Sequence, residues 1–383
     1  KEMKKLIAIL LVLVMALSLF ACAGSKDPSE SSNDPAKSED NNTSDTPAES
    51  GKKANIVLVI PNSLGDKAFS DMVWSGVQIA KEKNPDRVGN IKCIELQGDT
   101  TTPIPTLTEL AELGEWDIIV TGTFSLKESI VEVAAKFPEQ KFLIYDTELD
   151  YSDGKFKNCA SFAAMQNEGS FLGGALAAMA SKSGVIGFVG GKETSSVSDF
   201  LVGYIEGAKY VNPDIIVRSA FIGNFTDTAA AKELANAQNA QGADVVFAVC
   251  SGAGSGVYEA AADGGFWALG VDCDQSLILE DTNPAAAKAI LTSVVKNFDV
   301  VLSNAITEAL DGTLEFGKHN AIDLAAGGIG LADNSYYESA VSADIRAKVD
   351  EIAEKIKSGE IKVSTAIGMD ADTYNNLKES ASK

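Results

Sequence analysis

The chain has 383 residues, of which 45% are hydrophobic and 22% charged, as in an ordinary globular protein. Its net charge is −22, from 54 acidic and 32 basic residues, which argues against nucleic acid as a partner because phosphate binding needs clustered Lys and Arg. The single histidine, His319, disfavours histidine-based metal sites and Ser–His or Cys–His catalysis.

The N-terminal residues have the features of a bacterial lipoprotein signal. A short basic segment precedes an apolar run of fifteen residues, Leu6–Phe20, which is shorter than a membrane span and typical of a signal-peptide core. The sequence Leu19-Phe20-Ala21-Cys22 resembles a lipobox, which implies cleavage before Cys22 and a diacylglycerol on its sulfur. We therefore expect residues 1–21 to be a lipoprotein signal peptide; a plain secretory signal is the alternative.

The next segment is predicted to be a tether. Residues 23–52 contain no Val, Ile, Leu, Met or aromatic residue and are rich in Ser, Asp, Asn, Glu and Pro. Such a segment cannot bury enough apolar surface to fold. We expect Cys22 and the residues up to 52 to link a lipid anchor to a folded domain, which places the protein outside the cytoplasm at a bacterial cell membrane.

Four further cysteines lie in separate segments of the folded part: Cys93, Cys159, Cys250 and Cys273. No CxxC spacing occurs, so zinc binding and thioredoxin-type chemistry have no support. The sequence leaves open whether any of these cysteines pair.

From Lys53 onward, short apolar runs alternate with longer amphipathic ones in two successive series. The predicted strands are Ile56–Ile60, Ile91–Leu96, Asp117–Thr121 and Lys141–Tyr145, then Val185–Val189, Ile215–Phe221, Val245–Cys250 and Trp267–Val271. The predicted helices are Phe69–Asn84, Pro105–Gly114 and Leu126–Phe137, then Glu168–Ser181, Val197–Val211, Thr228–Gln241 and Gly254–Ala262. Continuous Ile/Val runs indicate strands buried on both faces, so the pattern predicts two doubly wound α/β lobes with parallel sheets.

The chain is expected to cross between these lobes several times. The strand-like segment Asn158–Ala164 would carry it out of the first lobe, and a return would occur near Lys296, between a strand, Ile290–Val295, and a helix, Asn297–Leu310. The Gly-rich stretch Ile322–Leu331 would cross again before a C-terminal helix, Ala343–Lys357. We assign residues 53–163 and 296–322 to an N-terminal lobe, and residues 164–295 and 323–383 to a C-terminal lobe. Several crossings make a hinge, which allows two lobes to close on a ligand.

Candidate binding residues follow the strands, because ligands of open parallel sheets bind beyond the carboxyl ends. In the first lobe these are the loop Asn62–Phe69, the loop Gly122-Thr123-Phe124 and Asp146, and in the second the loops Gly223–Asp227, Ser251–Gly256 and Gly270–Asp274. Aromatic side chains in opposing lobes and carboxylates at strand ends suit a flat polar molecule. The loop Ser251–Gly256 has glycine spacing that differs from a dinucleotide-binding fingerprint, so phosphate binding is not indicated.

Several motifs, in order, resemble the basic membrane protein (BMP) family, the PnrA-like nucleoside-binding lipoproteins that feed ABC transporters. The motifs are Gly65-Asp66-Lys67-Ala68-Phe69, Asn167-Glu168-Gly169-Ser170-Phe171-Leu172, Gly187-Phe188-Val189-Gly190-Gly191, Lys209-Tyr210-Val211-Asn212-Pro213 and Gly270-Val271-Asp272-Cys273-Asp274-Gln275. The resemblance extends from Ala54 to about Met369. It implies a type I periplasmic-binding-protein fold with a purine nucleoside held between the lobes.

Carried over by position, the resemblance implies roles for residues of both lobes around the base. Phe69 and Phe225 would stack on its two faces. Asn62, Asp66 and Asp146 would supply the polar contacts of the first lobe. Asp66 has an alternative role as the cap of the following helix.

The resemblance also implies a ribose site made of Gly252, Asp272 and Lys296, in which the carboxylate accepts hydrogen bonds from hydroxyls and the ammonium donates from the hinge. The sequence departs from the family pattern at Asn62, where an aspartate is usual. An amide donates as well as accepts hydrogen bonds, whereas a carboxylate only accepts, so the base preference can differ.

The leading hypothesis is therefore a monomeric, lipid-anchored substrate-binding protein that delivers a nucleoside to an ABC permease, without metal or cofactor. The same fold binding a sugar or another small polar metabolite is one alternative. A surface sensor whose ligand signals without being imported is another. A nucleoside hydrolase is disfavoured because the sequence has no clustered aspartate motif.

Overall fold

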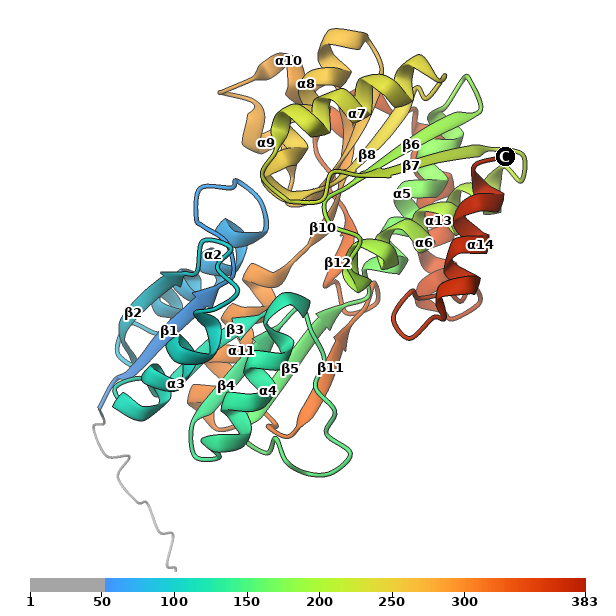
Figure 1. Cartoon of the computed structure of the whole chain (residues 1–383). Helices are drawn as coiled ribbons and strands as arrows, with labels where there is room; N and C mark the ends of the chain where they lie inside the picture. The colour runs from blue at the N-terminus through green and yellow to red at the C-terminus, as the bar shows by residue number, and fades with distance from the viewer. Residues whose placement is uncertain (1–51) are drawn as a thin grey trace, which may run out of the picture. The chain divides into compact units, whose positions relative to one another are not determined.

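The computed structural model describes residues 52–383, so the predicted signal peptide, Cys22 and nearly all of the predicted tether lie outside the described residues. These residues form two α/β lobes, each built on a six-stranded sheet (Figure 1). The strands are β1 (Ala54–Ile60), β2 (Val88–Glu95), β3 (Ile118–Gly122), β4 (Lys141–Tyr145), β5 (Cys159–Ala164), β6 (Val185–Gly190), β7 (Ile216–Phe221), β8 (Val245–Val249), β9 (Trp267–Asp272), β10 (Ile290–Lys296), β11 (Lys318–Ile322) and β12 (Ile329–Leu331).

Helices precede or follow most of these strands. They are α2 (Phe69–Lys83), α3 (Pro103–Leu113), α4 (Lys127–Lys136), α5 (Gln166–Ala180), α6 (Ser195–Val211), α7 (Thr228–Ala240), α8 (Gly254–Gly264), α9 (Gln275–Leu279), α10 (Pro284–Lys288), α11 (Phe298–Asp311), α12 (Ser335–Ala340), α13 (Ala343–Lys357) and α14 (Ala371–Ala381). Short 3₁₀ turns, η1 (Phe124–Leu126) and η2 (Ser251–Ala253), follow β3 and β8.

Both sheets are doubly wound. The first has the order β11-β5-β4-β3-β1-β2 with all strands parallel, and the second has the order β12-β10-β9-β8-β6-β7, in which only β12 runs antiparallel to its neighbour. This arrangement confirms the predicted fold class of two parallel-sheet lobes. The predicted strands all form, with ends that differ from the predictions by a few residues.

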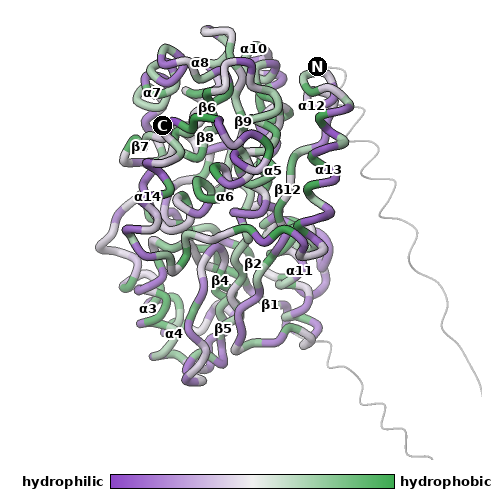
Figure 2. Tube along the Cα trace, turned by 90° about the vertical axis from the view of Figure 1, so that its right-hand side faces the viewer, coloured by the Kyte–Doolittle hydropathy of each residue, from purple (hydrophilic) through white to green (hydrophobic). Residues whose placement is uncertain are grey.

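Helices cover both faces of each sheet because successive strand residues point to opposite faces. In β1, Ile56 and Leu58 pack with α2 and α11, whereas Val57 and Val59 pack with α3 and α4. In the second lobe, α5, α6, α13 and α14 cover one face and α7, α8 and α10 cover the other. Figure 2 shows the consequence, with hydrophobic strands inside and polar segments on the outer helices.

Three chain segments connect the lobes and are hydrogen-bonded to one another. The chain passes from β5 to α5, from β10 to α11 and from β11 to β12. Met165 N donates to the carbonyl of Ile322 at 2.9 Å, and Asn297 N donates to the carbonyl of Gly328 at 3.0 Å. The predicted multi-crossing hinge is therefore present, and its segments are coupled by hydrogen bonds.

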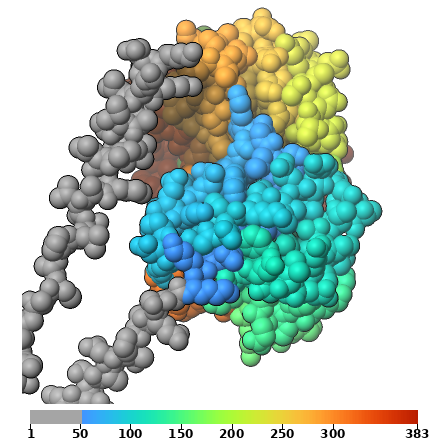
Figure 3. All heavy atoms as spheres, turned by 90° about the vertical axis from the view of Figure 1, so that its left-hand side faces the viewer, coloured from blue at the N-terminus to red at the C-terminus, as the bar shows by residue number. Residues whose placement is uncertain are grey.

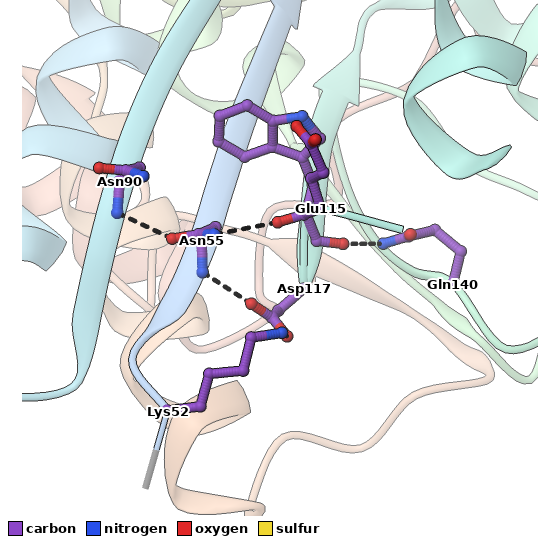
Figure 4. Close-up of polar contacts among 7 residues, drawn as sticks. Lys52, Asn55, Asn90, Glu115, Asp117 and Gln140 are labelled. Carbon is purple, nitrogen blue, oxygen red and sulfur yellow. Dashed lines mark hydrogen bonds and ion pairs between the residues drawn. The ribbon is translucent and has the colours of Figure 1, made fainter. Parts of the chain in front are cut away.

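The amino ends of the strands in the first sheet are closed by side-chain hydrogen bonds (Figure 4). The Asn55 amide donates to the carbonyl of Glu115 at 3.0 Å, and its oxygen accepts from Asn90 N at 2.9 Å. Asn55 N donates to the Asp117 carboxylate at 2.8 Å, which also pairs with Lys52 at 3.5 Å. These polar groups therefore satisfy one another at this edge of the sheet.

The helices α5 and α6 approach closely because glycine lies between them. A Cβ atom built on Gly207 would overlap the carbonyl of Phe171, and one built on Gly203 would overlap the carbonyl of Asn167. Since α6 also carries residues of the cavity described below, this contact sets the position of the site wall as well as the packing of the second lobe.

We predict that Gly207→Ala destabilises the protein by about 1–3 kcal/mol, because the helices must separate to admit the methyl group. The midpoint of urea denaturation should fall accordingly. Gly330→Ala is the matched control, since a Cβ atom there meets no atom within 4 Å. Equal midpoints for the two variants would show that the close approach of α5 and α6 does not limit stability.

Candidate functional site

Residues that follow strands of both sheets line a cavity of 130 Å³ between the lobes, called here the inner cavity. Its position beyond the carboxyl ends of two parallel sheets is where open α/β folds bind ligands. The sequence-predicted residues that line it are Asn62, Phe69, Asp146, Phe225, Asp272 and Lys296.

A second space, the outer cavity, has a volume of 650 Å³ and adjoins the first. The two share Asn62, Phe225 and Ser251 as lining residues. Figure 3 shows that blue residues, near the start of the described part of the chain, reach the orange and yellow part of the second lobe. There the Gln275 amide donates to the Lys67 carbonyl at 3.4 Å, so the loop after β1 closes one side of the interlobe space.

Backbone strain is concentrated at the same edge. Within residues 52–383, every non-glycine residue with a positive φ follows the carboxyl end of a strand and lines one of the two cavities. These residues are Lys67, Gln97, Thr123, Asp146, Ser251 and Asp272. Left-handed conformations of such residues cost on the order of 1–3 kcal/mol each and are typically retained at functional sites. The strained backbone conformations are therefore a second observation, beside the cavities, that indicates a functional site at the carboxyl ends of the strands.

Lys296, the last residue of β10, links the two lobes inside the inner cavity. Its ammonium lies 2.7 Å from the Asp146 carboxylate of the first lobe, and its side chain is only 2% exposed. The same nitrogen lies 5.3 Å from the ring centre of Phe69, 5.2 Å from that of Phe200 and 5.8 Å from that of Phe298. A buried ammonium needs such partners, because desolvation of an unpaired charge is costly.

Asp272, the last residue of β9, is a buried carboxylate without a hydrogen-bond donor among residues 52–383. Burial raises its pKa from 3.8 to about 7, against the lowering effect of Lys296 and with further raising effects of Asp146 and Asp66. The strand end holds this group at the cavity wall in a left-handed conformation with φ 66°. A ligand that donates hydrogen bonds would satisfy it.

Two aromatic side chains of opposite lobes also line the inner cavity. The Phe69 ring packs on Tyr145 and Phe298, with ring centres 5.9 and 5.7 Å apart. The Phe225 ring lies against Gly191, where a Cβ atom would overlap it. Phe69 is thus fixed by the core of the first lobe, and Phe225 by a turn of the second.

Two predicted site residues, Asp66 and Gly252, line the outer cavity and not the inner one. The Asp66 carboxylate accepts hydrogen bonds from the amides of Ala68, Ser70 and Asp71 at the start of α2, and from the Ser251 hydroxyl at 3.3 Å. Its helix-capping role, named above as the alternative, is therefore present. Asp66 also joins the lobes, since Ser251 belongs to the second.

Sequence reasoning missed part of the cavity wall. Thr123 and Phe124, which belong to a candidate loop after a predicted strand, line the cavity, as does Phe200 of α6. The residues that were missed are Ser125 of the first lobe and Thr194, Ser196 and Val197 at the start of α6. The sequence signal that could have identified these residues is their position after a strand. Ser125 follows β3, and the others follow the glycine turn after β6.

Other candidate chemistry is limited in the described part of the chain. Within residues 52–383, Cys93, Cys159, Cys250 and Cys273 are free thiols, and no three His, Cys, Asp or Glu side chains are grouped so as to hold a metal ion. Over the same residues, no helix has both the length and the apolar composition that a membrane span requires.

Comparison with known proteins agrees with this geometry. Residues 53–366 match the family described as "ABC transporter substrate-binding protein PnrA-like". The chain belongs to this family. It is therefore a substrate-binding protein of ABC transport, which takes up a small-molecule ligand outside the cytoplasm, presents it to a permease and is not an enzyme.

Individual relatives cover most of the chain. It is 27% identical to a "CD4+ T-cell-stimulating antigen" of Listeria innocua, over 93% of this chain and 97% of that protein. It is 29% identical to the "ABC transporter nucleoside-binding protein BmpA" of Lactococcus lactis, over 78% of this chain and 87% of that protein. A crystal structure of a solute-binding protein of an ABC transporter system from Aeropyrum pernix matches with a TM-score of 0.74 and 25% identity, over 86% of this chain and 97% of that one.

We predict that Asp272→Asn stabilises the ligand-free protein at pH 8 but not at pH 4. A folded-state pKa of about 7, raised above 3.8, means that ionisation opposes folding as the pH rises through this window. The gain at pH 8 is at most about 4 kcal/mol. Thermal melting at both pH values measures it.

Asp214→Asn, which removes an exposed carboxylate, is the control and should leave the pH profile of melting unchanged. A melting temperature of Asp272→Asn that falls at pH 8 would show that the carboxylate is satisfied within the protein and is not reserved for a ligand.

Proposed function

We propose that this protein is a lipid-anchored receptor that binds a nucleoside, with a purine base preferred, between its lobes and delivers it to an ABC importer. The observation that carries the proposal is the pairing of two aromatic walls, Phe69 and Phe225, with a buried carboxylate, Asp272, that lacks a donor. A nucleoside combines a flat apolar ring with vicinal hydroxyls, and therefore matches both features.

The aromatic walls belong to different lobes, and no aromatic pair among residues 52–383 joins Phe69 to Phe225. A base inserted between them gains contact with both lobes at once. Asn62 and Asp146 are among the polar groups of the first lobe at this cavity, and we assign them to the edge of the base. An amide at Asn62 can donate to a ring nitrogen or accept from an amino group.

We assign the ribose to the hinge side of the cavity. Asp272 would accept hydrogen bonds from its hydroxyls, and Lys296 would donate to it while keeping its ion pair with Asp146. Gly252 and Asp66 lie at the outer cavity, where the backbone of one lobe approaches the other. Their contribution would be to close the cleft over the bound sugar.

The name of the Lactococcus lactis relative, a nucleoside-binding protein, supports this ligand class. The anchor rests on the lipobox-like sequence at Cys22, outside the described residues. Delivery would follow from differential affinity: a ligand that contacts both lobes binds the closed form better, and the permease distinguishes that form.

A sugar is the second candidate, favoured by one observation. The inner cavity of 130 Å³ is smaller than typical ligand pockets of about 300–1,000 Å³, and a single sugar ring would fill it without the outer cavity. Affinity that does not depend on the presence of a base would then distinguish a sugar-binding protein from a nucleoside-binding one.

The test is isothermal titration of the protein with adenosine, guanosine, cytidine, ribose and glucose. We expect a nucleoside dissociation constant of about 1 μM or lower, which corresponds to roughly −8 kcal/mol, and no comparable binding of free sugars. Tight binding of ribose or glucose with none of the nucleosides would reject the proposal in favour of the sugar.

Phe69→Leu should weaken nucleoside binding at least about tenfold, because it keeps apolar volume but removes the stacking face. Phe316→Leu is the matched control, since Phe316 is half-buried in the first lobe and lines neither cavity. If Phe69→Leu binds as tightly as the control, the aromatic wall does not hold the ligand.

A further inference from the structure

The C-terminal segment of the chain packs against the wall of the site. The family match ends at residue 366, so α14 lies beyond it. In the structure α14 contacts α6 and the edge strand β7 (Figure 1). An element outside the matched residues thus supports the helix whose first turn lines the inner cavity.

The contact centres on Glu193. The Tyr374 hydroxyl donates to Glu193 Oε1 at 3.1 Å, and the Lys378 ammonium pairs with the same oxygen. This ammonium also lies 4.9 Å from the ring centre of Tyr374 and 5.7 Å from that of Phe221. A carboxylate with two donors, one of them held between two rings, is more tightly fixed than a simple surface ion pair.

Glu193 belongs to the turn between β6 and α6, which touches the site at two points. Thr194, the next residue, lines the inner cavity and caps α6 by accepting a hydrogen bond from Val197 N. Gly191, two residues earlier, supports the ring of Phe225. The position of this turn therefore sets one polar wall and one aromatic wall of the cavity.

The segment before α14 holds α6 at a second place. The Asp199 carboxylate is buried and accepts hydrogen bonds from the Thr365 hydroxyl at 2.6 Å and from Ala366 N at 2.8 Å. The next residue, Phe200, lines the inner cavity. Both attachments of the C-terminal segment thus lie directly beside residues of the cavity wall.

We propose that Tyr374 and Lys378 are positioning residues of the ligand site, which act through Glu193. They hold the turn that places Thr194 and supports Phe225, so that this wall is set before the ligand arrives. The inference rests on the proposed function for the identity of the ligand. It adds a determinant of affinity that touches neither cavity.

The test combines nucleoside titration with amide hydrogen exchange on the full-length protein. In Tyr374→Phe/Lys378→Met, the dissociation constant for adenosine or guanosine should rise about three- to tenfold, as expected for two lost hydrogen bonds to a partly exposed carboxylate. Exchange should accelerate in residues 190–197 and stay unchanged in the rest of the second lobe. Lys378→Arg in place of Lys378→Met, with Tyr374 retained, should return the dissociation constant and the exchange rates to those of the unsubstituted protein.

Glu193→Gln should weaken binding to a similar extent, and adding Lys378→Met to it should cause little further loss, because both act on one contact. Lys357→Met is the matched control. It removes an equal charge from an ion pair with Glu354 on α13, and should change neither binding nor exchange in residues 190–197.

Unchanged exchange in residues 190–197 of Tyr374→Phe/Lys378→Met would overturn the inference. So would faster exchange throughout the second lobe with a lower melting temperature, since that result indicates a general structural role. If the unsubstituted protein binds no nucleoside, the proposed function fails, and the exchange data still decide whether α14 fixes the turn.

Discussion

The buried ammonium of Lys296 is the interaction on which the site depends. It extends from a strand of the second lobe, pairs with Asp146 of the first at 2.7 Å and is surrounded by aromatic rings of both lobes. Removing one partner would leave a buried charge without compensation, which typically costs about 3–5 kcal/mol. The geometry of the lobes and the electrostatics of the inner cavity are therefore set by the same group.

The two ends of the first sheet differ in whether their polar groups are satisfied within the protein. At the amino ends, Asn55 and Asp117 take part in mutual hydrogen bonds. At the carboxyl ends of both sheets lie the left-handed residues and the unpartnered carboxylate of Asp272. Strain and unmet hydrogen bonding are thus retained at the proposed ligand site, and a stability gain from Asp272→Asn would measure the stability that this site sacrifices.

The sequence predicted the strands and the edge of the site because both follow from local patterns. Buried parallel strands read as apolar runs, and Asp272 ends such a run. The strand β11 was missed because Lys318–Ile322 contains polar residues and is an edge strand defined by its pairing with β5. The helix α14 has few apolar residues, so its place depends on partners distant in sequence, Glu193 among them. Tertiary contacts of this kind leave no periodic pattern of hydrophobic residues in the sequence.

Under the proposed function, the unpartnered carboxylate of Asp272 would make closure of the lobes depend on the ligand. Closing the lobes over Asp272 removes water from a charge that has no donor in the protein, which opposes the empty closed form. A ligand with hydroxyl donors removes that penalty while its ring gains contact with aromatic side chains of both lobes. Such a ligand would shift the balance between open and closed forms toward the closed form, which is the property that a permease needs in order to distinguish loaded from empty protein.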